Sequence, residues 1–208
     1  NQDIFMYKNN QWVIAKEPLH PGRPDVAGVG LAMSFSDTLQ KKFEKRIGLI
    51  PYAHGGTSLS EWQKGEKHYE NAARNTIEAL KNSRLKGILW HQGESDADRL
   101  ETAESYKERF MLFIHSFLKD IDIRDVPIIV GGLGDFLVHY EKGTYSHFIN
   151  NHLQNIGNSE NQFAFVSSEG LTDNGDFLHF NAHSLRDFGN RYASAWEECS
   201  KRLGVVLE

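Results

Sequence analysis

The chain has 208 residues, of which 39% are apolar, 12% aromatic and 25% charged. This composition is typical of a globular protein and excludes a disordered or fibrous chain. Twenty-three Lys and Arg against 28 Asp and Glu give a formal net charge of -5, without a long basic run, which argues against a nucleic-acid partner. No apolar stretch approaches the ~18 residues of a membrane-spanning helix, so a membrane role is excluded as well.

The single cysteine, Cys199, excludes an internal disulfide framework and any multi-cysteine metal site. It slightly favours a reducing, cytoplasmic compartment. The chain opens Asn1-Gln2-Asp3, with neither an initiator Met nor a leader pattern, so the N-terminus does not assign a localisation. The length predicts a single domain over residues 1–208, and the sequence leaves a homo-oligomer open.

Amphipathic and continuously apolar segments alternate along the chain from residue 31. In the first segment Leu31, Phe35, Leu39 and Phe43 recur every four positions, which places them on one face of a helix. A short apolar segment follows each helical pattern and predicts a buried strand. The sequence predicts helices over residues 31–43, 69–80, 106–117, 145–156 and 185–203, and strands over residues 47–53, 85–90, 126–130 and 163–166.

Continuously apolar strands separated by amphipathic helices indicate a parallel sheet covered on both faces. The predicted fold class is therefore α/β, a three-layer α/β/α sandwich. In such sheets ligands bind beyond the carboxyl ends of the strands. The loops that follow the predicted strands are rich in Gly and polar residues, so we expect the functional site in these loops.

A carboxylate and an imidazole lie three residues apart in the loop after the last predicted strand. At this spacing Asp176 can accept a hydrogen bond from one ring nitrogen of His179, which fixes the tautomer and leaves the other nitrogen as a general base. A polar surface turn is the alternative interpretation, because the spacing is common by chance. The position at the rim of the sheet favours catalysis.

The block Trp90–Asp96 (WHQGESD) follows the second predicted strand. Gln92 can donate an amide N–H into a cleft, which suits stabilisation of an oxyanion. Glu94 and Asp96 either support such a site or cap the helix that begins shortly after them, since acids favour a helix N-terminus. The sequence leaves both interpretations open.

Two glycines, Gly55 and Gly56, follow the first predicted strand. They permit a turn with positive φ that exposes backbone N–H groups to a ligand, or a tight turn without function. Ser58 is the best-placed hydroxyl on this rim, but a serine in such a loop is more often a cap than a nucleophile. His179 and His183 suggest a zinc site, although the glutamate of the two-histidine metalloprotease pattern is absent.

Together these segments resemble the SGNH-type carbohydrate esterases of the acetylxylan esterase and sialate O-acetylesterase group. The WHQGES and DxLH segments, in this order, are the specific part of the resemblance. The similarity covers nearly the whole chain, through residues 12–20 (WVIAKEPLH), 28–30, 47–62 (IGLIPYAHGGTSLSEW), 87–97 (GILWHQGESDA), 126–136 and 167–192.

The resemblance implies a flavodoxin-like fold and ester hydrolysis by a serine with its histidine and aspartate. His179 is then the general base and Asp176 orients it. The backbone of Gly55 and Gly56 and the side chain of Gln92 correspond to the oxyanion hole, and Glu94 supports the site. The substrate is expected to be an acetylated carbohydrate or a similar small ester, with neither cofactor nor metal.

The sequence departs from this family at the nucleophile. The family's serine belongs to a Gly-Gln-Ser-Asn block that follows the first strand, upstream of residues 12–20, and no such block occurs in residues 1–208. We therefore expect the serine to lie outside these residues. We also expect the first strand, together with the N-terminal part of the domain, to be missing. That strand lies inside the sheet, so its absence should leave neighbouring strands with unpaired backbone groups.

The expected function is thus a serine-type carbohydrate O-acetylesterase, a carboxylic ester hydrolase. A non-catalytic carbohydrate-binding or interaction protein on an esterase scaffold is the alternative that the missing nucleophile allows. A metal-dependent hydrolase that uses His179 and His183 is a third and weaker interpretation.

Overall fold

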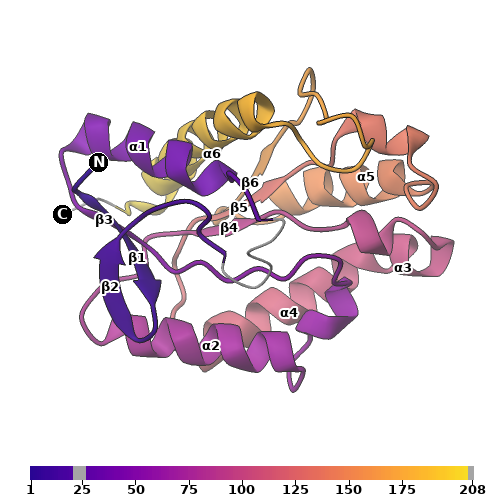
Figure 1. Ribbon diagram of the computed structural model, residues 1–208. Coiled ribbons are helices and arrows are strands. Elements are labelled where there is room, and N and C mark those ends of the chain that lie inside the picture. Colours follow the sequence, from indigo (N-terminus) through magenta and orange to yellow (C-terminus); the bar gives the residue numbers. More distant parts are fainter. Residues whose placement is uncertain (21–26, 206–208) are drawn as a thin grey trace.

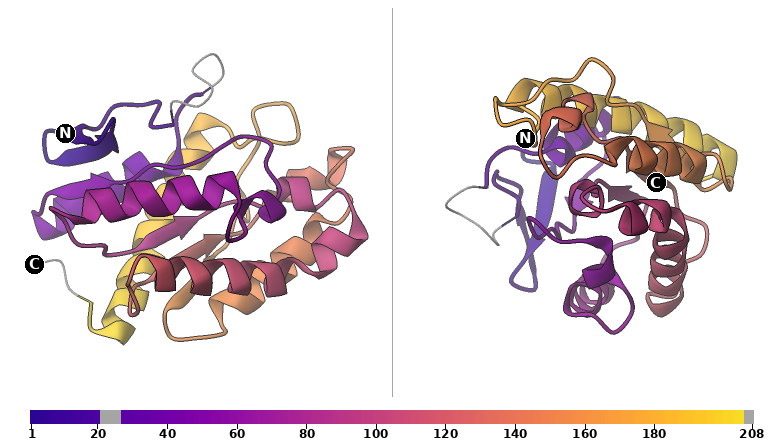
Figure 2. Two further views of the ribbon diagram at one scale, coloured as in Figure 1. Left: turned by 90° about the horizontal axis from the view of Figure 1, so that it is seen from below. Right: turned by 90° about the vertical axis from the view of Figure 1, so that its right-hand side faces the viewer.

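The computed structural model of the protein describes residues 1–20 and 27–205. Helices cover both sides of the strands, and Figure 1 and Figure 2 show this layering. None of the described helices is long and apolar enough to cross a membrane. In chain order the elements are β1 (Ile4–Lys8), β2 (Gln11–Ile14), α1 (Leu31–Phe43), β3 (Ile47–Leu49), η1 (Leu59–Trp62), α2 (Lys67–Leu80), β4 (Ile88–Trp90), η2 (Glu94–Asp96), α3 (Leu100–Glu104), α4 (Tyr106–Asp120), β5 (Ile128–Gly131), η3 (Asp135–His139), α5 (Ser146–Gly157), β6 (Phe163–Val166) and α6 (Ala182–Leu203).

The side chains of β5 alternate between two apolar clusters, one under each helical layer. Ile128 and Val130 pack with residues of α2, α4 and α5, whereas Ile129 packs with residues of α1 and α6. All three side chains are fully buried, and they alternate because successive side chains of a strand point to opposite faces. This confirms the predicted α/β fold with a parallel sheet and helices on both faces.

The strands of the described residues form two three-stranded sheets rather than one. The order is β2-β1-β3 in the first sheet and β4-β5-β6 in the second. The second sheet is parallel throughout, whereas the first combines the antiparallel pair β1–β2 with the parallel pair β1–β3. The predicted parallel arrangement therefore holds for β4-β5-β6 and for β1–β3, whereas the antiparallel β1–β2 pair differs from the prediction.

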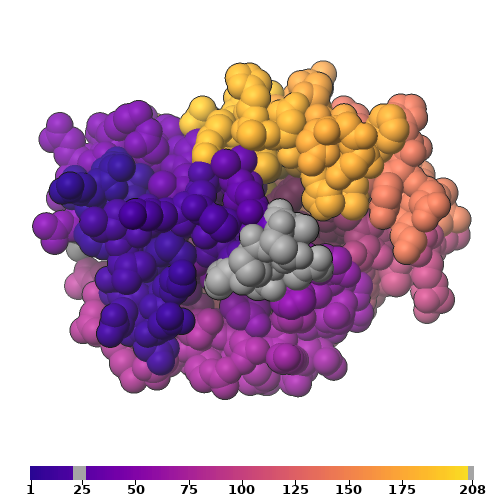
Figure 3. All heavy atoms as spheres, in the orientation of Figure 1, coloured from indigo at the N-terminus to yellow at the C-terminus, as the bar shows by residue number. Residues whose placement is uncertain are grey.

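The β1–β2 hairpin is absent from the sequence prediction. Asn9 and Asn10 form its turn with φ values of 52° and 60°, as a two-residue type I′ turn requires. The ring of Trp12 lies against β3, where a Cβ on Gly48 would come within 2.6 Å of it. Only glycine therefore fits at position 48, and the hairpin is held on β3. Figure 3 shows these indigo residues at the left of the face, with C-terminal residues in yellow above.

Facing edges of β3 and β4 lack strand partners in the described part of the chain. The Ile47 N–H donates to Asp3 in the direction of β1, and the Ile88 N–H donates to Pro127 in the direction of β5. Because backbone groups alternate along a strand, the N–H and C=O of Gly48 and Leu89 are directed away from these partners.

Several boundaries differ from the predicted ones for local reasons. The strand predicted over residues 47–53 ends at Leu49, since Pro51 has no N–H to donate to a neighbouring strand. The last helix begins at Ala182, ahead of Leu185, where its apolar stripe begins. Its N-cap is Asn181, whose side chain accepts a hydrogen bond from the Ser184 N–H at 2.9 Å. A cap sets this helix start, which apolar periodicity alone does not locate.

Candidate active site

The loop of residues 172–181, after β6, carries the predicted acid and base. Its shape is set by Asp173, whose Oδ2 accepts from the N–H groups of Gly175 at 3.0 Å and Phe177 at 2.8 Å. The two sides of the loop are joined by the Asn174 N–H, which donates to the carbonyl of His179 at 2.9 Å. These hydrogen bonds fix the part of the loop that carries Asp176 and His179.

Asp176 and His179 form a directly hydrogen-bonded pair. The Asp176 Oδ2 lies 2.7 Å from the His179 Nδ1, and its Oδ1 accepts from the backbone N–H groups of Leu178 at 2.9 Å and His179 at 2.8 Å. With Nδ1–H donating to the carboxylate, Nε2 carries the lone pair of the neutral ring. The His179 side chain is 67% exposed, so this nitrogen is accessible to a substrate.

The Asp176 carboxylate is strongly acidic. Partial burial acts to raise its pKa, but hydrogen bonds from the backbone and side chain of His179 and from the Leu178 N–H outweigh it and lower the pKa to about 2. The carboxylate is therefore ionised wherever an imidazole titrates. An ionised Asp176 can stabilise an imidazolium that forms on His179 during a reaction.

The loop after β3 exposes the backbone of Gly55 and Gly56. Gly56 has a φ of 77°, and neither glycine would bring a Cβ within 4 Å of another atom. Their N–H groups donate to none of the described residues. The loop is closed behind them by Thr57, whose hydroxyl donates to the His54 carbonyl at 2.9 Å and accepts from the Trp62 indole at 3.0 Å. Two unpaired donors thus remain on the open side of the loop.

Gln92 joins the loops that follow β3 and β4. Its Nε2 donates to the carbonyl of Thr57 at 3.1 Å and to the Oδ2 of Asp96 at 2.7 Å. Its Oε1 accepts from the Tyr106 hydroxyl at 3.1 Å. Both hydrogens of the carboxamide nitrogen are already donated. Gln92 can therefore donate to a ligand only if its hydrogen bond to the Thr57 carbonyl is replaced by one to the ligand.

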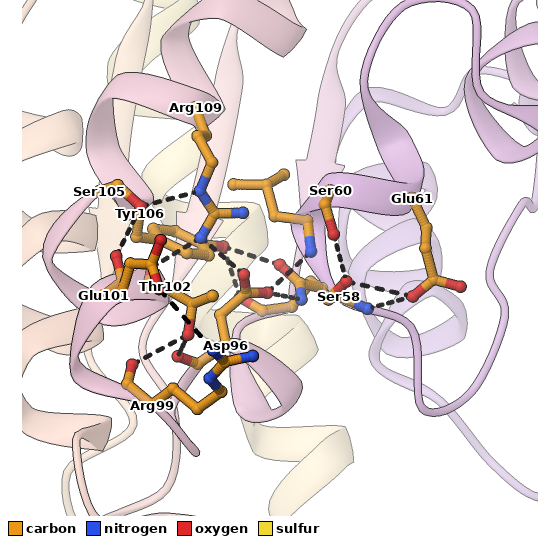
Figure 4. A network of polar contacts seen from close by, with 12 residues as sticks. Ser58, Ser60, Glu61, Asp96, Arg99, Glu101, Thr102, Ser105, Tyr106 and Arg109 are labelled. Carbon is orange, nitrogen blue, oxygen red and sulfur yellow. Dashed lines mark hydrogen bonds and ion pairs between the residues drawn. The ribbon is translucent and has the colours of Figure 1, made fainter.

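Asp96 has more partners than the sequence interpretation of a supporting acid or a cap suggests. It is fully buried and accepts from the Leu59 N–H at 2.8 Å, from Gln92 and from Arg109 Nη2 at 2.7 Å. Thr102 completes the set by donating to the Asp96 carbonyl at 2.9 Å. We call Asp96, Leu59, Gln92, Thr102 and Arg109 the Asp96 network (Figure 4). No local spacing joins residues 59, 96 and 109, so no sequence pattern signals it.

Glu94 pairs with His91, whose Nε2 lies 3.4 Å from its carboxylate. Burial acts to raise the pKa of Glu94, but the hydrogen bond and charge of His91 hold this pKa below its ordinary value. The His91 ring packs against Phe180 with centroids 5.7 Å apart. Glu94 thereby contacts a ring that packs against the residue next to His179.

The loops after four strands meet at this rim. His91–Phe180 links the loop after β4 to the 172–181 loop, and Phe180 also meets Phe136 of η3, after β5, with centroids 5.0 Å apart. The Gln92–Thr57 hydrogen bond adds the loop after β3. Every predicted site residue therefore lies in one connected group of loops at the carboxyl ends of the strands, where ligands bind in α/β sheets.

Two weaker candidates have structural roles. The Ser58 hydroxyl lies 2.7 Å from that of Ser60 and 3.2 Å from Glu61 Oε2, at the start of η1, which fits the cap interpretation. His183 lies in the first turn of α6, while Nδ1 of His179 is bonded to Asp176. The described residues contain no cluster of three or more His, Cys, Asp or Glu that could hold a metal ion.

Comparisons with known proteins identify the family of the chain. Residues 1–198 match the family described as carbohydrate esterase, sialic acid-specific acetylesterase (SASA). The probable carbohydrate esterase At4g34215 of Arabidopsis thaliana is 30% identical over 192 residues, which are 89% of this chain and 71% of that protein. The X-ray structure of the Arabidopsis protein superimposes with a TM-score of 0.87 at 29% identity, covering 95% of this chain and 81% of the other.

More distant structures share the fold. The carbohydrate acetylesterase XAC1771 from Xanthomonas citri gives a TM-score of 0.68 at 19% identity, over 96% of this chain and 48% of that one. The lipase Lip_vut3 from a goat rumen metagenome gives 0.60 at 12% identity, over 82% and 89%. With an SGNH-like α/β fold and a family match over nearly its whole length, the chain belongs to the SASA family of carbohydrate esterases.

Proposed function

We propose that the protein is a serine-type O-acetylesterase that removes acetyl groups from a sugar or glycan. The observation that carries the proposal is the Asp176–His179 pair, with Nδ1 fixed at 2.7 Å from the carboxylate and Nε2 exposed at the rim. This is the arrangement that a hydroxyl nucleophile needs for its activation. Membership of a carbohydrate esterase family supports an acetylated carbohydrate as the substrate.

The proposed reaction runs in two steps. A serine hydroxyl attacks the acetyl carbon, His179 Nε2 takes the serine proton, and the tetrahedral oxyanion forms. As this intermediate collapses, the bond to the sugar oxygen breaks and His179 returns the proton to that oxygen. His179 then deprotonates a water molecule that attacks the acetyl carbon. The bond from this carbon to the serine oxygen breaks, His179 returns the proton to the serine, and the acetyl group is released as acetic acid. Asp176 stabilises the imidazolium in both steps.

The oxyanion is assigned to the donors of the loop after β3 and to Gln92. The N–H groups of Gly55 and Gly56 donate to none of the described residues and are therefore available to an oxyanion. Preorganised donors of this kind lower the barrier of acyl transfer. Gln92 contributes the Nε2 hydrogen that it otherwise donates to the Thr57 carbonyl. Glu94 holds His91 and supports the packing behind His179.

The attacking serine is proposed to lie outside residues 1–208, on a strand between β3 and β4. The motif Gly-Gln-Ser-Asn does not occur in these residues. The backbone N–H and C=O of Gly48 are directed away from β1 and those of Leu89 away from β5, while Ile47 and Leu89 pack against the same apolar cluster. A strand in that position would end beside Gly55 and Gln92, which is where the nucleophile is needed.

A serine-reactive fluorophosphonate with peptide mapping of the adduct tests the function and the origin of the serine together. The reagent is applied to the 208-residue chain and to the protein as encoded by its gene. We expect a label on a peptide outside residues 1–208, and loss of the label in His179→Ala. A label on Ser58 would overturn the assignment of the nucleophile. A folded, fully encoded protein that takes no label would favour a carbohydrate-binding protein on the esterase scaffold.

A further inference from the structure

Asp96 holds a negative charge in the interior, away from the Asp176–His179 pair. Its side chain is fully buried, and its Arg109 partner is 21% exposed. Arg109 is itself fixed by the Thr102 carbonyl at 2.6 Å and by the Ser105 hydroxyl at 3.1 Å. Figure 4 shows Arg109 directed toward Asp96, with Thr102 and Ser105 beside it. The carboxylate is held by the Leu59 N–H, the Gln92 side chain and Arg109, which come from η1, the loop after β4 and α4.

Asp96 determines the orientation of the Gln92 carboxamide. Nε2 of Gln92 faces the Asp96 carboxylate at 2.7 Å and the Thr57 carbonyl at 3.1 Å, and Oε1 faces the Tyr106 hydroxyl at 3.1 Å. An end-for-end swap would put the amide oxygen against two acceptors, since a carboxylate and a carbonyl cannot donate. The nitrogen is thus directed to the loop after β3.

The two hydrogen bonds of Nε2 differ in strength. A bond to an ionised carboxylate is roughly twice as strong as one between neutral groups. The Gln92 hydrogen bond to Asp96 is therefore the one that is kept. The weaker bond, from Gln92 to the neutral Thr57 carbonyl, is the one that a ligand replaces. Asp96 also accepts the Leu59 N–H at 2.8 Å, so the same carboxylate anchors the loop that carries Gly55 and Gly56.

We propose that Asp96 is a positioning residue for the oxyanion site, acting through Gln92 and through the loop after β3. The proposal rests on the proposed function, in which Gln92 and the glycine backbone N–H groups bind the acyl oxygen. It adds that their relative position is set by one buried carboxylate that touches neither substrate nor nucleophile. Arg109 Nη2, 2.7 Å from Oδ1, supplies the counter-charge to this buried carboxylate.

The first test needs no activity. The Gln92 side-chain NH2 resonances are observed by ¹H–¹⁵N NMR in wild type and in Asp96→Asn, with Asp120→Asn as the matched control. Asp120, at the other end of α4, also accepts hydrogen bonds, from Lys64 Nζ and from the Tyr69 hydroxyl. We expect the Gln92 signals to shift in Asp96→Asn alone. Unchanged signals would overturn the proposal. Should Asp96→Asn not fold, wild type decides, since two rapidly exchanging Gln92 protons would contradict the contact.

The second test is a double-mutant cycle on acetyl ester hydrolysis by the protein as encoded by its gene. Gln92→Ala is expected to lower kcat by ~10²-fold, and Asp96→Asn by ~10-fold or more with KM within about twofold. In the Gln92→Ala background, Asp96→Asn should slow the reaction by a clearly smaller factor than in wild type, because the part of its effect that passes through Gln92 is already lost. Multiplying effects would overturn the proposal. A wild type without esterase activity would refute the proposed function and leave the NMR result to judge Asp96.

Discussion

The 172–181 loop and the Asp96 network are two ways of fixing a polar group at the same rim. The loop places Asp176 and His179 through hydrogen bonds among its own residues, and both side chains are largely exposed. The network places Gln92 through residues 59, 96, 102 and 109, around a carboxylate without solvent contact. The loop can therefore change with little effect on folding, whereas the network couples the site to the stability of the core.

The largest effect is expected on activity, from the exposed pair. His179→Ala should lower kcat/KM of the protein as encoded by its gene by ~10³–10⁴-fold, because the serine loses its base. Its free energy of unfolding should change by less than ~0.5 kcal/mol, as for other exposed substitutions. Kinetics and urea unfolding measure both quantities. A variant that is as active as wild type would refute the assigned base.

The next effect is expected on stability, from the buried network. Arg109→Met leaves the Asp96 carboxylate without its counter-charge in the interior, which should cost about 3–5 kcal/mol in urea unfolding. Lys81→Met breaks an exposed ion pair. Lys81 Nζ lies 2.7 Å from the Glu78 carboxylate, and the Lys81 side chain is 62% exposed. This control should change stability by less than ~1 kcal/mol. Equal losses in both variants would remove the contrast between the two regions.

A smaller effect is expected at the glycines. Gly56→Ala places an L-residue at a φ of 77°, which should cost ~1–2 kcal/mol. Gly55→Ala is the matched control, since position 55 has the same open space without the positive φ, and it should cost less than ~0.5 kcal/mol. Thermal or urea unfolding of the two variants distinguishes backbone strain from crowding.

The smallest effect concerns pH. The pKa of Asp176 is lowered to about 2 in the folded protein, so the folded state favours the ionised carboxylate. The contribution to stability is then present above the unfolded-state pKa of ~3.9 and is lost as the pH falls through about 2. The stability difference between wild type and Asp176→Asn should be constant from pH 7 to 5 and should shrink toward pH 2. Asp98→Asn, at another exposed aspartate, serves as the control.

The sequence predicted the parts of this molecule that depend on neighbours in the chain. Apolar periodicity located the main helices and the strands that follow them. The Asp-x-x-His spacing predicted a pair that the structure forms at 2.7 Å. The Asp96 network escaped prediction because its members meet only after the loops after β3 and β4 have packed on α4. The β1–β2 hairpin escaped because its turn signal, Asn9-Asn10, is weaker than the Asn-Gly pattern.

The contact of Trp12 with Gly48 makes the hairpin optically distinguishable from the rest of the chain. Trp62, Trp90 and Trp196 are each at most 8% exposed, whereas Trp12 is only half-buried on β3. A polar quencher such as iodide therefore reaches the indole of Trp12 first. Local detachment of the hairpin changes this one emission while the other three persist. The fluorescence of the unmodified protein thus provides a separate signal for the opening of its N-terminal sheet.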